Sequence, residues 1–226
     1  MKLDCVITAT DNNPLYLDFV PLFIKSWLKL YPSIDVKIII VNNEIPPILN
    51  SFKKHLILFK PLINIKTSFI AQYIRLLYPA ILNYKNGVLI TDMDMLPMNN
   101  SYYTDPIKDI SNDKFIYYRG FAPSKYQYAM CYNIASSKTW SEIFGIKNIE
   151  ELEMEVKNKY RNGKATWFED QRSLYKYINN WKYKSDRFVN LNDTITKFNR
   201  LDRICLKFDN RTIRNIKNKI YSDYHC

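Results

Sequence analysis

The sequence predicts a single α/β domain with a mainly parallel central sheet, helices on both of its faces, and a mixed second half. Three observations support this fold class. Apolar runs typical of buried strands alternate with segments of helical periodicity. One apolar run ends in two aspartates. No linker or repeat interrupts the 226 residues, and a single hydrophobic core can stabilise a domain of this length.

The alternation of elements is regular in the first half of the chain. Strands are expected at residues 3–8, 36–41, 56–59, 88–90, 114–118 and 128–136, and helices at 15–31, 67–83, 138–144, 149–160, 168–179 and 211–220. Strands that alternate with helices favour parallel pairing through right-handed crossovers. The second half is less regular, so we expect mixed pairing there.

The last expected helix is short, basic and amphipathic. Ile213, Ile216 and Ile220 recur on one side of it, and Arg211, Arg214 and Lys217 lie on the others. We expect the isoleucine stripe to pack on the domain. Contact with an acidic membrane surface is the less favoured alternative.

Composition restricts the class of protein. Lys and Arg number 33 and Asp and Glu number 22, so the formal net charge is 33 − 22 = +11, which favours anionic partners such as nucleotide phosphates. Neither a signal peptide nor an apolar run of roughly 20 residues is visible, and we expect a cytoplasmic protein. The four cysteines are far apart and predict free thiols rather than disulfides or zinc ligands.

The two aspartates that follow the strand at 88–90 form a D-x-D motif. Asp92 and Asp94 are expected to point the same way at the carboxyl end of the sheet, where open α/β folds bind ligands. Two carboxylates, completed by water and phosphate oxygens, suit Mg²⁺ or Mn²⁺. The alternative is a solvated strand end, because so short a motif also occurs by chance.

Three motifs in order resemble those of the GT-A glycosyltransferases. They are Gln72-Tyr73-Ile74-Arg75-Leu76, Leu89-Ile90-Thr91-Asp92-Met93-Asp94 and Glu169-Asp170-Gln171. The chain is similar to the retaining, glycogenin-like and bacterial galactosyltransferase-like members, and to small GT-A domains of large DNA viruses, which would imply the host cytoplasm. The resemblance implies one Rossmann-like GT-A domain over residues 1–226, with a nucleotide-binding half at 1–100 and an acceptor-binding half at 101–226. The domain is either the whole protein or a piece cut from a longer one.

The resemblance also implies roles for individual residues. The positions that match the uracil and ribose site are Ala9, Thr10, Asp11 and Tyr16. Asp92 would reach the ribose and the metal, and Asp94 would bind the metal directly. Arg75 would lie close to the donor sugar and its phosphates. The third metal ligand is often a C-terminal histidine, for which His225 is a better candidate than His55, expected at the surface.

Three more positions match the sugar site. Asn133 resembles an asparagine of the family's Asn-Ala-Gly strand, although Ile-Ala follows it here. Asp170 and Gln171 would lie around the sugar ring. In an inverting enzyme Glu169 or Asp170 would be the catalytic base; in a retaining enzyme Asp170 and Gln171 would orient the sugar. The Asp-Gln pair favours retention.

The expected function is therefore metal-dependent transfer of a sugar from a nucleoside diphosphate sugar to a carbohydrate or glycoprotein acceptor. Mn²⁺ or Mg²⁺ is the expected cofactor, and a UDP-sugar is the favoured donor. One alternative is a sugar nucleotidyltransferase, although the loop after the first strand lacks the glycines that such an enzyme needs. The other is a non-enzymatic basic nucleic-acid-binding protein, although no RNA-binding signature is present and no nucleic-acid partner is expected.

Overall fold

The computed structural model describes residues 1–120, 125–160, 165–205 and 209–226. Within these residues a seven-stranded sheet has the order β3-β2-β1-β4-β7-β6-β8. A second sheet of three strands has the order β5-β10-β9. The strands are β1 (Leu3–Asp11), β2 (Asp35–Val41), β3 (Leu56–Phe59), β4 (Gly87–Ile90), β5 (Met95–Pro97), β6 (Phe115–Tyr117), β7 (Asn133–Ala135), β8 (Phe188–Asn190), β9 (Asn199–Asp202) and β10 (Tyr221–His225).

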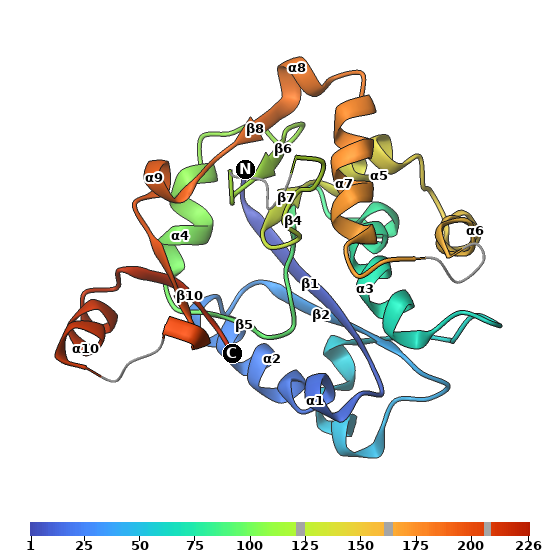
Figure 1. Cartoon of the computed structure of the whole chain (residues 1–226), viewed down its shortest axis with the longest axis horizontal. Helices are drawn as coiled ribbons and strands as arrows, with labels where there is room; N and C mark the ends of the chain where they lie inside the picture. The colour runs from blue at the N-terminus through green and yellow to red at the C-terminus, as the bar shows by residue number, and fades with distance from the viewer. Residues whose placement is uncertain (121–124, 161–164, 206–208) are drawn as a thin grey trace.

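Helices cover both faces of the larger sheet (Figure 1). The α-helices are α1 (Pro14–Leu17), α2 (Phe19–Leu30), α3 (Thr67–Leu77), α4 (Asn100–Thr104), α5 (Ser137–Phe144), α6 (Ile149–Lys159), α7 (Glu169–Asn180), α8 (Lys184–Arg187), α9 (Asp193–Thr196) and α10 (Asn210–Lys217). The 3₁₀ helices are η1 (Pro47–His55), η2 (Tyr78–Ile81), η3 (Asp105–Ile107) and η5 (Arg203–Cys205). Among the described residues, no helix has the length and apolar character that crossing a membrane requires.

The pairing of strands confirms the predicted fold class. The first four strands of the sheet, β1 to β4, pair in parallel. The second half is mixed, because β7 runs antiparallel to both β4 and β6, whereas β8 is parallel to β6. The carboxyl ends of β1, β2 and β4 therefore lie at one edge of the sheet, where a ligand site is expected.

Alternation along the central strands builds a core on each face of the sheet. Ile7 of β1 joins the core that α3, α5, α6 and α7 cover, whereas Val6 joins the core beneath α2 and α4. Trp140 and Trp27, both fully buried, anchor these two cores. Burial of each large apolar side chain stabilises the fold by about 1.5–3 kcal/mol. The sheet, whose strand β4 leads to Asp92, lies between these two helical layers (Figure 1).

Two predicted helices are shorter than expected because of proline. The helix predicted at 15–31 is divided into α1 and α2 at Asp18. Pro21 has no N–H to bond the carbonyl of Leu17, so one continuous helix cannot pass through this point. The helix predicted at 67–83 ends at Leu77, and a 3₁₀ helix that contains Pro79 follows it.

The strand predicted at 128–136 is also shorter, because only Asn133–Ala135 pairs in the sheet. The Asn133 side chain turns back on the preceding segment: its Nδ2 donates to the carbonyl oxygens of Ala129 and Met130 at 2.9 and 2.7 Å. These bonds hold 129–130 in a loop beside the strand.

The isoleucine stripe of α10 does not pack on the domain, so that prediction is wrong. Ile213 and Ile216 are 41% and 39% exposed, and Thr212 is the buried residue of this helix. The helix projects from the body of the molecule between β9 and β10 (Figure 1). Pairing of β10 with β5 and β9 ties the end of the chain to the domain instead.

Candidate active site

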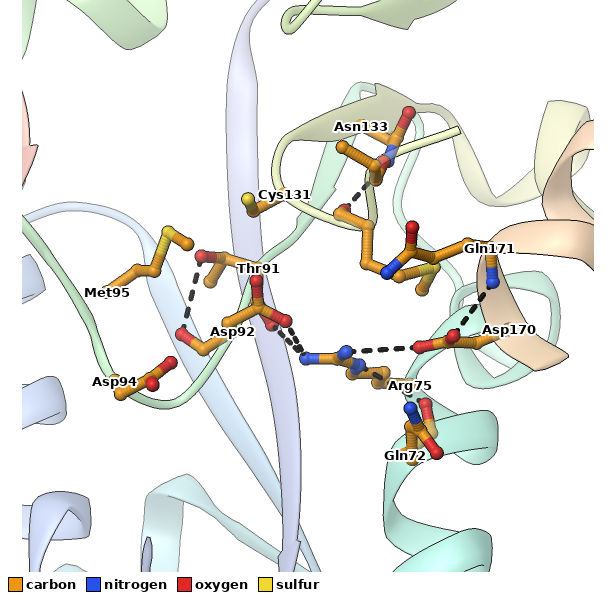
Figure 2. A network of polar contacts seen from close by, with 12 residues as sticks. Gln72, Arg75, Thr91, Asp92, Asp94, Met95, Cys131, Asn133, Asp170 and Gln171 are labelled. Carbon is orange, nitrogen blue, oxygen red and sulfur yellow. Dashed lines mark hydrogen bonds and ion pairs between the residues drawn. The ribbon is translucent and has the colours of Figure 1, made fainter. Parts of the chain in front are cut away.

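The D-x-D residues lie on a turn between two strands. Strand β4 ends at Ile90, and the chain turns through Asp92, whose carbonyl oxygen accepts a bond from Met95 N at 3.3 Å, to enter β5. Asp92 and Asp94 therefore lie on a turn beyond β4 and not on one face of a strand, which corrects the expected strand geometry. Asp92 is directed to Arg75 on α3 (Figure 2). Asp94 is directed to His225 on β10.

Arg75 links two carboxylates that are far apart in the sequence. Its Nη1 pairs with Asp92 Oδ1, and its Nη2 lies 3.2 Å from Asp170 Oδ2 at the start of α7 (Figure 2). Its Nε donates to the carbonyl oxygen of Gln72, one helical turn earlier, at 3.2 Å. The Arg75 side chain is 12% exposed, so the guanidinium bridges α3, the D-x-D turn and α7 with little contact with water.

Burial and charge shift the pKa values of these groups. Burial raises the pKa of Asp170 to about 6, against the opposing charge of Arg75. Burial also opposes ionisation of Asp92, but the charge and hydrogen bond of Arg75 outweigh it and hold the pKa of Asp92 below its usual range. Burial, and then the charge of Asp92, raise the pKa of Asp94. Arg75 is therefore the counter-charge that favours the ionised forms of Asp92 and Asp170.

The histidine at the end of β10 reaches the second aspartate of the motif. His225 Nε2 lies 3.4 Å from Asp94 Oδ2, and His225 Nδ1 lies 2.8 Å from Asp202 Oδ2. Arg203, whose side chain is 54% exposed, also approaches Asp94 Oδ2 at 3.6 Å. The structure thus brings His225 to the D-x-D turn, whereas His55 is buried, not at the surface as expected, and pairs with the carbonyl oxygen of Val36.

The oxygen of Asp94 and the nitrogen of His225 suit a divalent cation as ligands. Two ligands at right angles on an ion with bonds of about 2.1 Å lie roughly 3 Å apart, which is near the separation of Asp94 Oδ2 from His225 Nε2. No three His, Cys, Asp or Glu side chains in the described ranges form a complete metal-binding group. The pair therefore fits an ion such as Mn²⁺ that takes its remaining ligands from phosphate and water, with Asp92 close by.

The residues expected at the nucleotide lie at the end of β1. Ala9 and Thr10 are buried in the strand. Asp11 accepts bonds from Thr67 Oγ1 at 2.9 Å and from the backbone N–H of Asn13 at 3.1 Å, which tie the loop to α3. Burial, followed by the charges of Asp94 and Asp92, raises the pKa of Tyr16, so this ring lies near the D-x-D turn.

Two buried side-chain oxygens around the site have no hydrogen-bond partner among the described residues. They are Asn133 Oδ1, in a fully buried side chain, and Gln171 Oε1. Gln171 lies beside Asp170 and across from Asn133 (Figure 2). Buried polar atoms are nearly always paired in folded proteins. A hydroxyl-rich ligand would supply the missing donors.

Glu169 does not join the Arg75 network. Its carboxylate accepts a bond from Ser173 Oγ at 3.5 Å, one turn further along α7. Asp170 differs, because its Oδ1 accepts from the backbone N–H of Gln171 at 2.8 Å and its Oδ2 faces Arg75. The structure therefore brings Asp170 and Gln171 to the site and leaves Glu169 on the flank of the helix.

The sequence interpretation missed a buried ion cluster behind the site. Asp223 on β10 is fully buried and pairs with Arg119 and with Arg200, whose Nε lies 3.0 Å from Asp223 Oδ2. Arg200 Nη2 also reaches Cys131 Sγ at 3.1 Å. Tyr221 and Tyr224, a residue type enriched in strands, are a weak sequence signal for a strand at 221–225. Asp202 and Arg203 carried no signal, because the residues that they contact, His225 and Asp94, are distant in the sequence.

One surface depression lies elsewhere on the molecule. It measures about 900 Å³ and is lined by residues such as Tyr84, Asn112, Lys138 and Arg187, near the amino end of β4. Arg187, one of the cations that line it, is already paired with Asp113 and Glu142. The candidate active site is therefore identified by its charged network and not by the volume of a cavity.

Comparison with solved structures places the fold. The galactosyltransferase LgtC, solved with donor and acceptor sugar analogues, matches with a TM-score of 0.54 and 15% identity over 98% of this chain and 86% of its own. GlyE of Streptococcus pneumoniae matches with a TM-score of 0.56 and 16% identity over the whole of this chain, which spans 54% of that protein.

A third solved structure also matches nearly the whole chain. A glycosyltransferase involved in glycosylation of the major capsid of PBCV-1 matches with a TM-score of 0.56 and 9% identity, over 99% of this chain and 93% of its own. No protein-family model and no curated protein matches the sequence. The agreement with three glycosyltransferase structures over nearly the whole chain confirms the predicted fold: this protein has a GT-A-like fold.

Proposed function

We propose that this protein is a glycosyltransferase that moves a sugar from a nucleoside diphosphate sugar, with UDP as the favoured nucleotide, to a carbohydrate or glycoprotein acceptor. The observation that carries the proposal is the ionic network in which Arg75 joins Asp92 of the D-x-D turn to Asp170 of α7. This network lies at the carboxyl end of the sheet of a GT-A fold whose structural neighbours are glycosyltransferases.

The leaving group in such a reaction is a diphosphate, and stabilisation of its growing charge should lower the barrier most. Asp94 and His225, with Asp92, would hold Mn²⁺ or Mg²⁺, which when bound supplies positive charge to the diphosphate. Arg203 is half exposed beside Asp94 and is available to pair with a phosphate oxygen. Arg75 keeps Asp92 ionised and in place.

The sugar would lie between the Arg75 network and the two unpartnered oxygens. Asn133 Oδ1 and Gln171 Oε1 can each accept a hydrogen bond from a sugar hydroxyl. On the acceptor side, the Trp167 side chain is 67% exposed, and the backbone carbonyl oxygen of Trp167 accepts a bond from Gln72 Nε2, which holds this backbone beside α3. A flat exposed indole suits the face of a carbohydrate acceptor.

The state of the two candidate bases supports retention of configuration. An inverting enzyme needs a carboxylate that can reach the acceptor hydroxyl. Both oxygens of Asp170 are engaged, its side chain is 1% exposed, and Glu169 faces Ser173. In a retaining enzyme the leaving phosphate can take the proton instead, and Asp170 and Gln171 orient the sugar.

Titration of UDP into the purified chain tests the nucleotide and the metal together. With Mn²⁺ we expect micromolar binding by calorimetry, corresponding to about −8 kcal/mol. With EDTA the affinity should fall by at least tenfold, because the diphosphate then faces Asp92 and Asp94 without a cation. Equal binding in both buffers would refute the metal requirement, and no binding in either would refute the UDP donor.

A companion assay separates this proposal from the alternatives. A glycosyltransferase should release UDP slowly from a UDP-sugar, whereas a nucleotidyltransferase should form a UDP-sugar from UTP and a sugar 1-phosphate. Nucleic-acid binding would appear as affinity with a steep dependence on salt. The central strands do not favour that option, because both faces of the sheet are covered by the two cores.

The pKa of Asp170 predicts an acid limit to turnover. Below about pH 6 Asp170 takes up a proton and its ion pair with Arg75 is lost, so donor turnover should decline with a midpoint near 6. Asp170→Asn should be slow at all pH values and lack this midpoint. Rates measured across the acid range would check both. An unchanged acid limit in Asp170→Asn would exclude Asp170 as its cause.

The raised pKa of Asp170 affects stability in the opposite direction: low pH, which lowers turnover, favours the folded state at this group. The ordinary pKa of an aspartate is about 3.9, so between this value and about 6 the folded state binds the proton more tightly than the unfolded state. The contribution of Asp170 to stability is therefore fully present below about pH 4 and is lost as the pH rises through about 6. The difference in unfolding free energy between the wild type and Asp170→Asn should follow this course.

A further inference from the structure

The three-stranded sheet brings together three side chains that are distant in the sequence. In the central strand β10, His225 is paired with Met95 of β5 on one side and with Asp202 of β9 on the other. Asp94 immediately precedes Met95, and its carbonyl oxygen accepts a bond from the backbone N–H of Cys226 at 2.9 Å. Asp94, His225 and Asp202 therefore form a row across the edge of this sheet.

The contacts along this row are directional. His225 Nδ1 lies 2.8 Å from Asp202 Oδ2, and His225 Nε2 lies 3.4 Å from Asp94 Oδ2. The Asp202 carboxylate is itself held, because its Oδ1 accepts a bond from the backbone N–H of Ile204 at 2.9 Å. Each ring nitrogen thus faces one carboxylate, and the carboxylate at Nδ1 is fixed by a second bond.

These contacts determine where the imidazole carries its proton. A neutral imidazole has one N–H and one lone pair, and the hydrogen bond made by one nitrogen decides which of them the other presents. A carboxylate oxygen at Nδ1 selects the Nδ1–H form. Nε2 then presents its lone pair toward Asp94, and two electron-rich atoms at this separation repel each other unless a cation lies between them.

We propose that Asp202 is a positioning residue, which holds the ring and the Nδ1–H tautomer of His225 so that Nε2 faces Asp94 across the position of a divalent cation. The proposal rests on the proposed function, because the cation that His225 and Asp94 would bind is the cation of that reaction. Carboxylates behind a histidine ligand commonly have this role, and their loss costs about 10–100-fold in metal affinity.

Nitrogen NMR of the histidines tests the positioning without metal or substrate. The chain has two histidines, so replacing one of them by Asn or Ala leaves a single histidine and assigns its NMR signals. Above the pH of imidazole titration, His225 should show the Nδ1–H tautomer in the wild type and shift toward Nε2–H in Asp202→Ala. Asp202→Asn should lie between them, because an amide oxygen can still accept one of the two bonds. An unchanged tautomer in Asp202→Ala would overturn the proposal.

Titration of Mn²⁺ alone tests the consequence for the cation. Asp202→Ala should bind Mn²⁺ about 10–100-fold more weakly than the wild type, and His225→Ala at least as weakly. Adding Asp202→Ala to His225→Ala should cause no further loss, because Asp202 acts through the imidazole. Asp209→Ala is the matched control: Asp209 also accepts a backbone N–H bond, from Thr212 at 2.7 Å, but at the start of α10.

The outcomes distinguish the role of Asp202 from the existence of the metal site. Weaker binding in His225→Ala with wild-type binding in Asp202→Ala would overturn the role of Asp202 and leave the metal site standing. Wild-type Mn²⁺ binding in both variants would refute the metal site in the proposed function, and the role of Asp202 with it. An equal loss in Asp209→Ala would show general weakening of the C-terminal region and would also overturn the proposal.

Discussion

Replacing Arg75 by alanine is expected to lower the free energy of unfolding by about 3–5 kcal/mol, the range found when one partner of a buried ion pair is removed. The variant leaves Asp92 and Asp170 without their shared counter-charge, and Asp170 is 1% exposed. Total stabilities of domains are about 5–15 kcal/mol, so the loss is a large fraction. Urea unfolding of the wild type and the variant would measure it.

Two further variants separate charge from packing. Arg75→Lys retains the charge but cannot reach two carboxylates with one planar group, so it should lose less stability and still turn over slowly. The triple variant Arg75→Met, Asp92→Asn, Asp170→Asn removes all three charges. It should recover most of the stability while remaining inactive. If it is as unstable as Arg75→Ala, the unpaired charges are not the cause of the loss.

Replacing Asp94 by alanine is expected to give the largest loss of turnover, on the order of 10²–10³-fold or more, as for the removal of a group that stabilises charge in the transition state. The fold should be preserved, because the backbone carbonyl that binds Cys226 remains. Donor turnover and Mn²⁺ affinity should fall together. Asp94→Asn tests the charge at constant shape, and Asp105→Ala, an exposed aspartate of η3, is the control.

Full turnover of Asp94→Ala in Mn²⁺ would refute the metal-dependent mechanism. Loss of turnover with wild-type Mn²⁺ affinity would place Asp94 at the substrate and not at the cation. These two outcomes are distinguishable because the metal titration needs no donor.

The local pattern of apolar residues predicted the first half of the fold well. Parallel strands buried on both faces produce continuous apolar runs, such as the run from Ile38 to Val41, and β1 to β4 all lie where such runs occur. Helix ends were less predictable. A single proline, Pro21, divided a segment whose apolar period continues on both sides of it.

The site was predicted in its residue types and misjudged in its geometry. Short motifs identified Asp92, Asp94, Arg75 and Asp170, and the structure brings all four to one edge of the sheet. Their directions differ from those of an ideal strand, because the strand ends at Ile90 and each aspartate turns to its own cation or imidazole. Such choices depend on partners from α3, α7 and β10, which local periodicity cannot identify.

The sequence by itself determined the α/β class, the parallel direction of the first strands and the identity of the charged residues, because burial patterns and short motifs are local properties of the chain. Only the tertiary structure decided that Arg75 stands between Asp92 and Asp170, that the isoleucines of α10 remain exposed, and that β10 pairs between β5 and β9. The physical reason is that ion pairing and sheet edges are satisfied by whichever segments the fold brings together. The row of Asp94, His225 and Asp202 therefore exists only in the folded chain.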